Sequence, residues 1–262
     1  MTTSLVVPDR DDRAAVDKAI SLLTAFGDQA STGVGVSELA RRAQLSKSTA
    51  FRVLGMLERN GVVERSGTGY RLGARLHQLG QTVYSPEHER TRDMLLPFLT
   101  DLYEMSRHTV HLAALHGTDV VYLAKLYGHR TVAAPSRIGG RLPAHTTAVG
   151  KVLIAYTPST AATTRAEPLR ALTPHSVTDL ASLSDELAVV RRSGIAYDNQ
   201  ESRLGLSCIA APVFDHRGRA IASLSIAGQH GRFDSHRLEA GLRHVCSAAS
   251  RAIARTQLSR TA

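Results

Sequence analysis

Residues 36–54 read VSELARRAQLSKSTAFRVL and have the pattern of two short helices joined by a tight turn. Ser37 is suited to cap the first helix, residues 38–43, because a serine hydroxyl can accept an N–H of the first turn. Ser46 is suited to cap the second, which runs to about residue 60 before Gly61 ends it. The spacing predicts a helix-turn-helix.

The second of these helices has two different faces. Its core face repeats at helical spacing through Ala50, Val53, Leu54 and Leu57. The opposite face then carries Lys47, Ser48, Phe51, Arg52 and Gly55. A basic, hydroxyl-rich first turn is typical of a helix that enters the DNA major groove, where an arginine can pair with guanine. Taken alone, the same face also fits a capped surface helix.

The flanking segments favour the DNA-binding reading. Residues 14–26 form a helix whose expected core face is Val16, Ile20, Leu23 and Phe26. Residues 62–65 and 70–72 flank the turn residues 66–69 and predict a β-hairpin. Residues 41–75 hold eight basic and two acidic residues, a net charge of +6. Three helices and a basic hairpin predict a winged helix-turn-helix.

The rest of the chain predicts a second, α+β domain. We expect a polar tail at 1–11, the winged domain at 12–73, a linker helix at 74–87 and the second domain at 88–257. The helical spacing around the linker runs from Leu72 to Tyr84. Within the second domain we expect helices at 88–106, 146–156, 179–193 and, capped by Ser235, 235–257. Strands are expected at 109–116, 120–126, 130–135, 194–197, 207–214 and 219–226, with an antiparallel sheet.

Composition restricts the function classes. The net charge is +9 and the pI about 10.1, which favours a polyanionic partner. No window approaches the roughly 18 apolar residues of a membrane span, and the first residues lack a signal-peptide pattern. Two cysteines cannot form a disulfide framework. We therefore expect a cytoplasmic protein with no membrane partner.

Six segments together resemble the isocitrate lyase regulator (IclR) family. Residues 36–54, 61–65 and 70–73 are similar to its helix-turn-helix and wing, and residues 140–151, 192–201 and 205–214 to its second domain. The similarity spans about residues 12–256. It implies a GAF/profilin-like effector-binding domain with a curved antiparallel sheet. It also implies a ligand-responsive regulator of a catabolic operon, more often a repressor than an activator, that is not an enzyme and needs no cofactor.

The resemblance also implies partners and site residues. The partners are a pseudo-palindromic double-stranded operator, a small-molecule effector and further copies of the chain, as a homodimer or homotetramer. The DNA-contacting candidates are Ser37, Ser46, Lys47, Ser48, Thr49, Phe51, Arg52, Arg65 and Arg71. The effector-binding candidates are Ala148, Val149, Asp198, Leu206, Cys208, Ser225 and Ala227. N–H groups at a helix start favour a carboxylate. Alanine at position 227 favours a larger, partly apolar acid, of which aromatic acids are one class.

Other readings stay open at this stage. Cys208 can be a buried strand residue, Asp198 can end a strand and Ser225 can be a satisfied hydroxyl. An enzyme would use Cys208 as nucleophile with His145 or His216 as base, but no catalytic motif surrounds them. A DNA-binding architectural protein without a ligand is the third class. No metal is expected at His108, His111 and His116, because on a strand His111 faces away from the other two.

Overall fold

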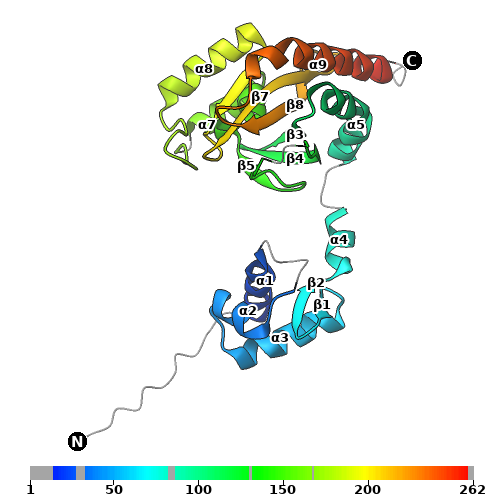
Figure 1. The fold of residues 1–262 in the computed structure, drawn as a ribbon, viewed down its shortest axis with the longest axis vertical. Coiled ribbons are helices and arrows are strands. Elements are labelled where there is room, and N and C mark those ends of the chain that lie inside the picture. Colours follow the sequence, from blue (N-terminus) through cyan, green and yellow to red (C-terminus); the bar gives the residue numbers. More distant parts are fainter. Residues whose placement is uncertain (1–13, 28–32, 82–85, 130–131, 167, 259–262) are drawn as a thin grey trace, which may run out of the picture. The chain divides into compact units, whose positions relative to one another are not determined.

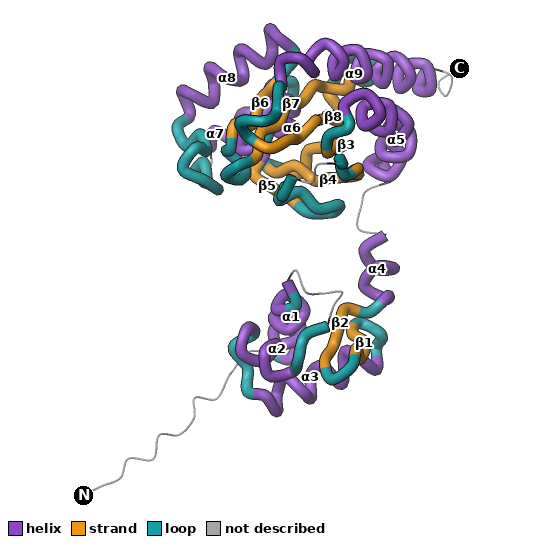
Figure 2. Tube along the Cα trace, in the orientation of Figure 1, coloured by secondary structure: helices purple, strands orange, loops and turns teal. Residues whose placement is uncertain are grey.

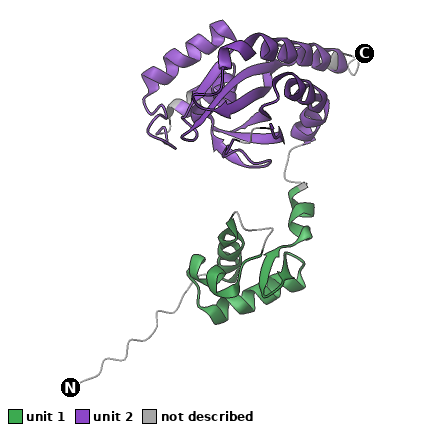
Figure 3. Ribbon diagram, viewed as in Figure 1, with its two compact units in different colours: residues 1–85 green, residues 86–262 purple. Residues whose placement is uncertain are grey.

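The computed structural model of the chain describes residues 14–27, 33–81, 86–129, 132–166 and 168–258. The chain divides into two compact units, residues 1–85 and 86–262 (Figure 3). Each unit has its own hydrophobic core. In the described residues no helix is long and apolar enough to cross a membrane.

The first unit is a small three-helix domain with a hairpin. In chain order it contains α1 (Ala15–Ala25), α2 (Val36–Arg42), α3 (Lys47–Arg59), β1 (Val63–Ser66), β2 (Gly69–Leu72) and α4 (Ala74–Gln81) (Figure 1). The hairpin strands are antiparallel, and Val34 forms a bridge to Tyr70 that adds a short third segment. Leu22, Leu39 and Leu54 from the three helices are fully buried at its centre.

The turn chemistry expected around α3 is confirmed. Ser46 caps the helix, its Oγ accepting the N–H of Thr49 at 3.2 Å. Gly61, with φ of 68°, ends it: its own N–H reaches the carbonyl of Glu58 and the N–H of Val62 reaches that of Leu57, both at 2.9 Å. This is the Schellman arrangement, which a residue without Cβ adopts most easily.

Three expectations for this unit are wrong. Gly35, not Ser37, is the N-cap of α2, so Ser37 lies inside its first turn. Of the core face expected on α1, Phe26 is buried and Leu23 packs against the core, but Val16 and Ile20 are 71% and 57% exposed, and Leu22 is buried instead. The helix after the hairpin begins at Ala74, because Leu72 completes β2. The predicted Val83–Tyr84 end of that helix lies outside the described residues.

The second unit is built on one six-stranded sheet. Its strands are β3 (Thr109–His116), β4 (Asp119–Leu126), β5 (Arg141–Pro143), β6 (Ala196–Asn199), β7 (Leu206–Phe214) and β8 (Ala220–Gln229). Their order is β5-β4-β3-β8-β7-β6 (Figure 2). Every neighbouring pair is antiparallel. The helices are α5 (Pro86–Ser106), α6 (Ala148–Ala155), α7 (Pro158–Ala166), α8 (Leu180–Ser193) and α9 (Ser235–Leu258), with a 3-10 turn at Ala144–Thr146. The expected α+β class is confirmed.

Helices cover both faces of this sheet. On β7, Cys208 and Ala210 belong to the core around α6. Ala211, which points to the opposite face, places its carbonyl 3.7 Å from the sulfur of Cys246 on α9. Helices α5 and α9 contact each other over that second face (Figure 1). Because both faces are covered, β7 is buried almost throughout, as its continuous apolar sequence suggests.

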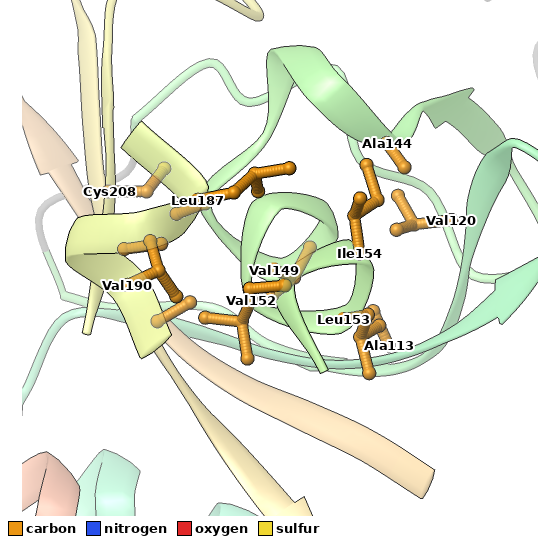
Figure 4. Packing of buried hydrophobic residues seen from close by; sticks show 14 of the residues in the cluster. Ala113, Val120, Ala144, Val149, Val152, Leu153, Ile154, Leu187, Val190 and Cys208 are labelled. Carbon is orange, nitrogen blue, oxygen red and sulfur yellow. The ribbon is translucent and has the colours of Figure 1, made fainter. Parts of the chain in front are cut away.

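Helix α6 is the centre of the second core. All eight of its residues are buried. Figure 4 shows Val149, Val152 and Leu153 of this helix between Leu187 and Val190 of α8 on one side and sheet residues on the other. Gly150 is required here, because a Cβ would lie 2.1 Å from the carbonyl oxygen of Ala144. This close approach fixes the start of α6 against the turn that precedes it.

Two further expectations are corrected in this unit. Residues 132–135 form no strand, and residues 130–131 lie outside the described part. Val132 and Ala134 instead pack as irregular chain on the α6 core, and Arg141–Pro143 supplies the edge strand. Ser235 is the first residue of α9 rather than its cap, because Asp234 Oδ1 accepts the N–H of Arg237 at 3.2 Å. Helix α7 was not expected from the sequence.

Candidate functional site

One face of α3 is open to solvent. Lys47, Ser48, Phe51 and Arg52 are all exposed, while Ala50, Val53 and Leu54 are buried beneath them. At the helix start, Ser46 Oγ lies 2.8 Å from Thr49 Oγ1 and 3.1 Å from Ser48 Oγ, so the hydroxyls form one cluster. The two faces are thus divided as the sequence predicts. The exposed one offers hydroxyl, ammonium and guanidinium donors.

The hairpin holds its arginines beside carboxylates. The Arg65 guanidinium lies 4.3 Å from the ring centre of Tyr70 and 5.8 Å from that of Phe51, and its Nε lies 3.4 Å from Glu58. Arg71 donates to Glu64 at 2.9 Å, and Glu64 also accepts the N–H of Ala74. That backbone bond and Arg71 lower the pKa of Glu64. Both arginines therefore have an internal partner, which would reduce the free energy that either gains by binding a DNA phosphate.

A small buried cavity lies at the start of α6, on the face of the sheet that this helix covers. Its volume is about 10 Å³, room for about one water molecule. It is lined by residues of α6, five strands and the loops between them: His111, Tyr122, Ala134, Pro135, Ser136, Thr147, Ala148, Val149, Asp198, Ser202, Leu206, Cys208 and Ser225. Thr147 caps the helix by accepting the N–H of Gly150 at 3.0 Å.

Six of the seven effector-binding candidates line this cavity. The exception is Ala227, which is buried in the core and paired with Cys208 on β7 and Thr109 on β3. The sequence did not single out His111, Tyr122 or Ser136 as lining residues. The parity of strand 109–116 could have indicated His111, because it shares a face with Ala113 of the α6 core.

The carboxylate of Asp198 accepts hydrogen bonds from neighbouring groups of the protein itself. Its Oδ1 accepts the N–H groups of Glu201 at 2.8 Å and Ser202 at 3.2 Å, and its Oδ2 accepts the hydroxyl of Ser202 at 2.5 Å. Burial raises the pKa of Asp198, and these bonds oppose that rise. Asp198 therefore orders the turn after β6, which Gln200 forms with a φ of 65°.

Cys208 has the surroundings of a structural thiol. It is buried, and burial raises its pKa well above the ordinary value, so the sulfur stays protonated. His145 lies elsewhere: its Nε2 is 3.0 Å from the carbonyl of Arg170, beside a different cavity. A nucleophile needs a thiolate and a base within hydrogen-bond reach. This geometry does not support the interpretation of Cys208 as the nucleophile of an enzyme.

A polar network closes the cavity on the side of β3. His111 Nδ1 lies 3.2 Å from Ser225 Oγ, and its Nε2 lies 2.8 Å from Ser136 Oγ. Lys125 donates to the carbonyl of Ser136 at 2.9 Å and to its hydroxyl at 3.1 Å. Burial, with a smaller contribution from the Lys125 charge, lowers the pKa of His111 to about 3. The imidazole is therefore neutral at neutral pH.

A winged helix-turn-helix joined to an α+β domain defines a class of DNA-binding regulators, and the chain falls in it by similarity as well. Residues 15–67 match the IclR helix-turn-helix domain, and residues 87–255 match the bacterial transcriptional regulator IclR C-terminal domain. The chain therefore belongs to the IclR family of transcriptional regulators, whose members bind DNA and are not enzymes.

Individual relatives agree along most of the chain. The HTH-type transcriptional regulator KdgR of Escherichia coli K12 is 32% identical over 234 residues, covering 87% of each chain. The crystal structure of Thermotoga maritima IclR has a TM-score of 0.74 at 30% identity, covering 92% of this chain and 97% of that one. An IclR homolog from Microbacterium hydrocarbonoxydans, solved with 4-hydroxybenzoate, has a TM-score of 0.74 at 28% identity, covering 92% and 99%.

Proposed function

We propose that this regulator binds a pseudo-palindromic operator of a catabolic operon, acts in the cytoplasm as a repressor, and is switched by a small organic acid. The DNA-binding domain is assigned to residues 12–73 and the effector-binding domain to residues 88–257, joined by residues 74–87. The observation that carries the proposal is the buried cavity at the start of α6, placed in a chain that also presents a basic helix face.

The DNA contacts are assigned to α3 and the hairpin. Arg52 is exposed on α3 and, in the major groove, can form two hydrogen bonds to one guanine. Lys47 and the hydroxyls of Ser46, Ser48 and Thr49 lie at the helix N-terminus, where phosphate is favoured. Ser37 is exposed in the first turn of α2 and Phe51 packs toward Arg65, so both are assigned to the rim of the interface.

The effector site is assigned to the cavity residues. Ala148 and Val149 supply the first turn of α6, Ser225 a hydroxyl, and Leu206 and Cys208 an apolar wall. Asp198 acts through the turn it orders rather than through direct contact, and Ala227 supports Cys208 from the neighbouring strand. The relative solved with 4-hydroxybenzoate supports an aromatic acid as one class of ligand.

The proposal includes assembly as a homodimer or homotetramer. A single winged helix covers too little DNA for tight specific binding, so two must act on symmetric half-sites. Exposed apolar side chains on the first unit suit contacts with a second copy: Val16 and Ile20 on α1 and Leu79 on α4.

Footprinting combined with sedimentation tests both halves of this proposal. DNA upstream of the neighbouring genes should show two protected half-sites about one helical turn apart, and the protein should sediment as a dimer or larger at micromolar concentration. A monomer that binds the same DNA with undiminished affinity would contradict the assembly. An absence of any protected site would contradict the operator assignment.

A further inference from the structure

Lys125 is a buried cation beside the cavity. It is only 9% exposed, and its ammonium group bonds to two oxygens of one residue, the carbonyl and the hydroxyl of Ser136. Among the described residues, none of the ion pairs includes Lys125. A buried ammonium without a counter-charge is costly, since neutral oxygens replace only part of its hydration.

Another buried lysine of the second unit does have carboxylate partners. Lys151 on α6 is 3% exposed and lies 2.7 Å from both Glu186 and Glu201. This lysine is fully neutralised and joins α6 to α8 and to the turn after β6. By contrast, the partners that Lys125 has are neutral: the two oxygens of Ser136, and the ring of Tyr127, whose centre lies 4.7 Å from Nζ.

The sheet register places this charge toward the cavity. Lys125 on β4 is directly opposite His111 on β3, so the two side chains share a face. The register then skips Leu123, and Tyr122 returns to that same face opposite Ala113. His111 and Tyr122 both line the cavity. One wall of the pocket therefore carries an imidazole, and the ammonium group of Lys125 lies behind Ser136 on the same side.

Ser136 occupies the position that suits an anion. Its carbonyl and hydroxyl oxygens lie 2.9 and 3.1 Å from Lys125 Nζ, and the hydroxyl also lies 2.8 Å from His111 Nε2. A carboxylate would present two oxygens to the ammonium group in the same way, and it would add a full negative charge. Ser136 lies in irregular chain between β4 and β5, so moving it breaks no strand pairing.

We infer that Lys125 and His111 bind the carboxylate of the effector, which takes the place of Ser136. The inference rests on the proposed function and adds the ligand class and two binding residues to it. The cavity of about 10 Å³ requires such an exchange, because it holds about one water and no organic acid. Withdrawal of Ser136 enlarges the cavity and frees the donors for the anion in one movement.

Calorimetry on the full chain with paired probes tests the inference. The probes are aliphatic and aromatic monocarboxylates, including pyruvate, benzoate and 4-hydroxybenzoate, each with its neutral amide. At least one acid should bind, and its amide should bind about tenfold more weakly or worse. Lys125→Met should weaken acid binding by about tenfold or more and leave amide binding unchanged.

Two further variants separate charge at the pocket from general effects. Arg141→Met removes an exposed cation from the neighbouring strand β5 and should leave acid binding unchanged. Ser136→Ala removes the competing hydroxyl and should keep or strengthen acid binding. A thermal unfolding curve for Lys125→Met with a midpoint at or above that of the wild type shows that the variant is folded.

The outcomes distinguish this inference from the function on which it rests. Acid binding that survives Lys125→Met in full, or amides that bind as tightly as acids, would overturn the assignment. So would a wild-type protein that binds none of the acids. The proposed function fails on a different result, namely that no small molecule of any charge alters operator binding.

Discussion

The imidazole of His111 and the hydroxyl of Ser225 meet across strands β3 and β8, with 3.2 Å between Nδ1 and Oγ. Residues 114 positions apart thus form one wall of the cavity. Ser225→Ala should weaken effector binding by about 1 kcal/mol, the net value of one hydrogen bond, and should also lower stability by about 1 to 3 kcal/mol, because it leaves Nδ1 of the buried His111 without its partner. Titrating effector into both proteins while following heat release measures the difference in binding.

Asp198→Ala should behave differently, because the Asp198 carboxylate holds the turn after β6. The N–H groups of Glu201 and Ser202 would lose their acceptor, at about 1 to 3 kcal/mol for each group left unpaired. We expect urea unfolding to show a clear loss of stability. A variant as stable as the wild type, but unable to bind effector, would instead mean that Asp198 contacts the ligand directly.

The neutral state of His111 predicts an acid-dependent loss of stability. Its folded-state pKa of about 3 lies below the value of about 6.5 in an unfolded chain. Between these values the unfolded chain binds a proton that the folded chain excludes, so stability falls as pH decreases from 6.5 toward 3. The full contribution is present above pH 6.5. At pH 5 the loss is about 2 kcal/mol.

His111→Asn removes this titration and serves as the matched control. Urea unfolding of both proteins at pH 7 and pH 5 gives the comparison. The variant should lose about 2 kcal/mol less than the wild type over that interval, because asparagine binds no proton in either state, while Lys125, Tyr122 and Asp198 around position 111 are the same in both proteins. Equal losses in the two proteins would show that the folded protein accepts the proton at His111.

The buried lysine of α6 predicts a non-additive pair of substitutions. Burial alone would lower the pKa of Lys151, but the ion pairs with Glu201 and Glu186 raise it overall. Lys151→Met leaves Glu201 buried without its cation, which should cost about 3 to 5 kcal/mol. Adding Glu201→Gln should recover part of that loss in urea unfolding. If the two losses simply add, the pair does not interact as described.

Local patterns predict the α3 region and most of the strands. The Ser46 cap, the Gly61 stop and the buried Val53 and Leu54 depend on residues within one or two turns of each other, and each is confirmed. Local patterns also predict strands 109–116 and 207–214, because unbroken apolar and β-branched runs are typical of a sheet covered on both faces.

Long-range packing determines the features that local sequence patterns did not predict. Val16 and Ile20 belong to the same apolar stripe of α1 as Phe26, yet they are exposed, and Leu22, which the stripe leaves out, is buried in the core. The polar wall of the cavity depends on which strands pair and on the skipped Leu123, neither of which leaves a local signal. The pocket role of the seven effector candidates stays a prediction, although six of them meet at one cavity.

Substitutions on the α3 face and in the hairpin should have two different effects on DNA binding. Arg52→Ala should cost about 1 to 3 kcal/mol on the operator and relax preference at one base position. Arg71→Ala should weaken all duplexes to a similar and smaller extent, because Arg71 already bonds to Glu64, and should reduce the salt dependence by at most about one unit. Binding measured against single-base variants of the operator distinguishes these patterns. An Arg52→Ala protein with unchanged affinity and preference would place another face in the groove.

We propose that a ligand bound in the α6 cavity changes the affinity of the same chain for DNA at α3. The most direct test of this proposal is the operator dissociation constant of the full chain, measured by fluorescence anisotropy with and without a saturating acid that binds the second unit. Coupling requires that the ligand favour one arrangement of the protein over another. We predict a change of at least about fivefold, or 1 kcal/mol, that is lost in Lys125→Met. An acid that saturates the cavity and leaves the operator constant unchanged would contradict the account.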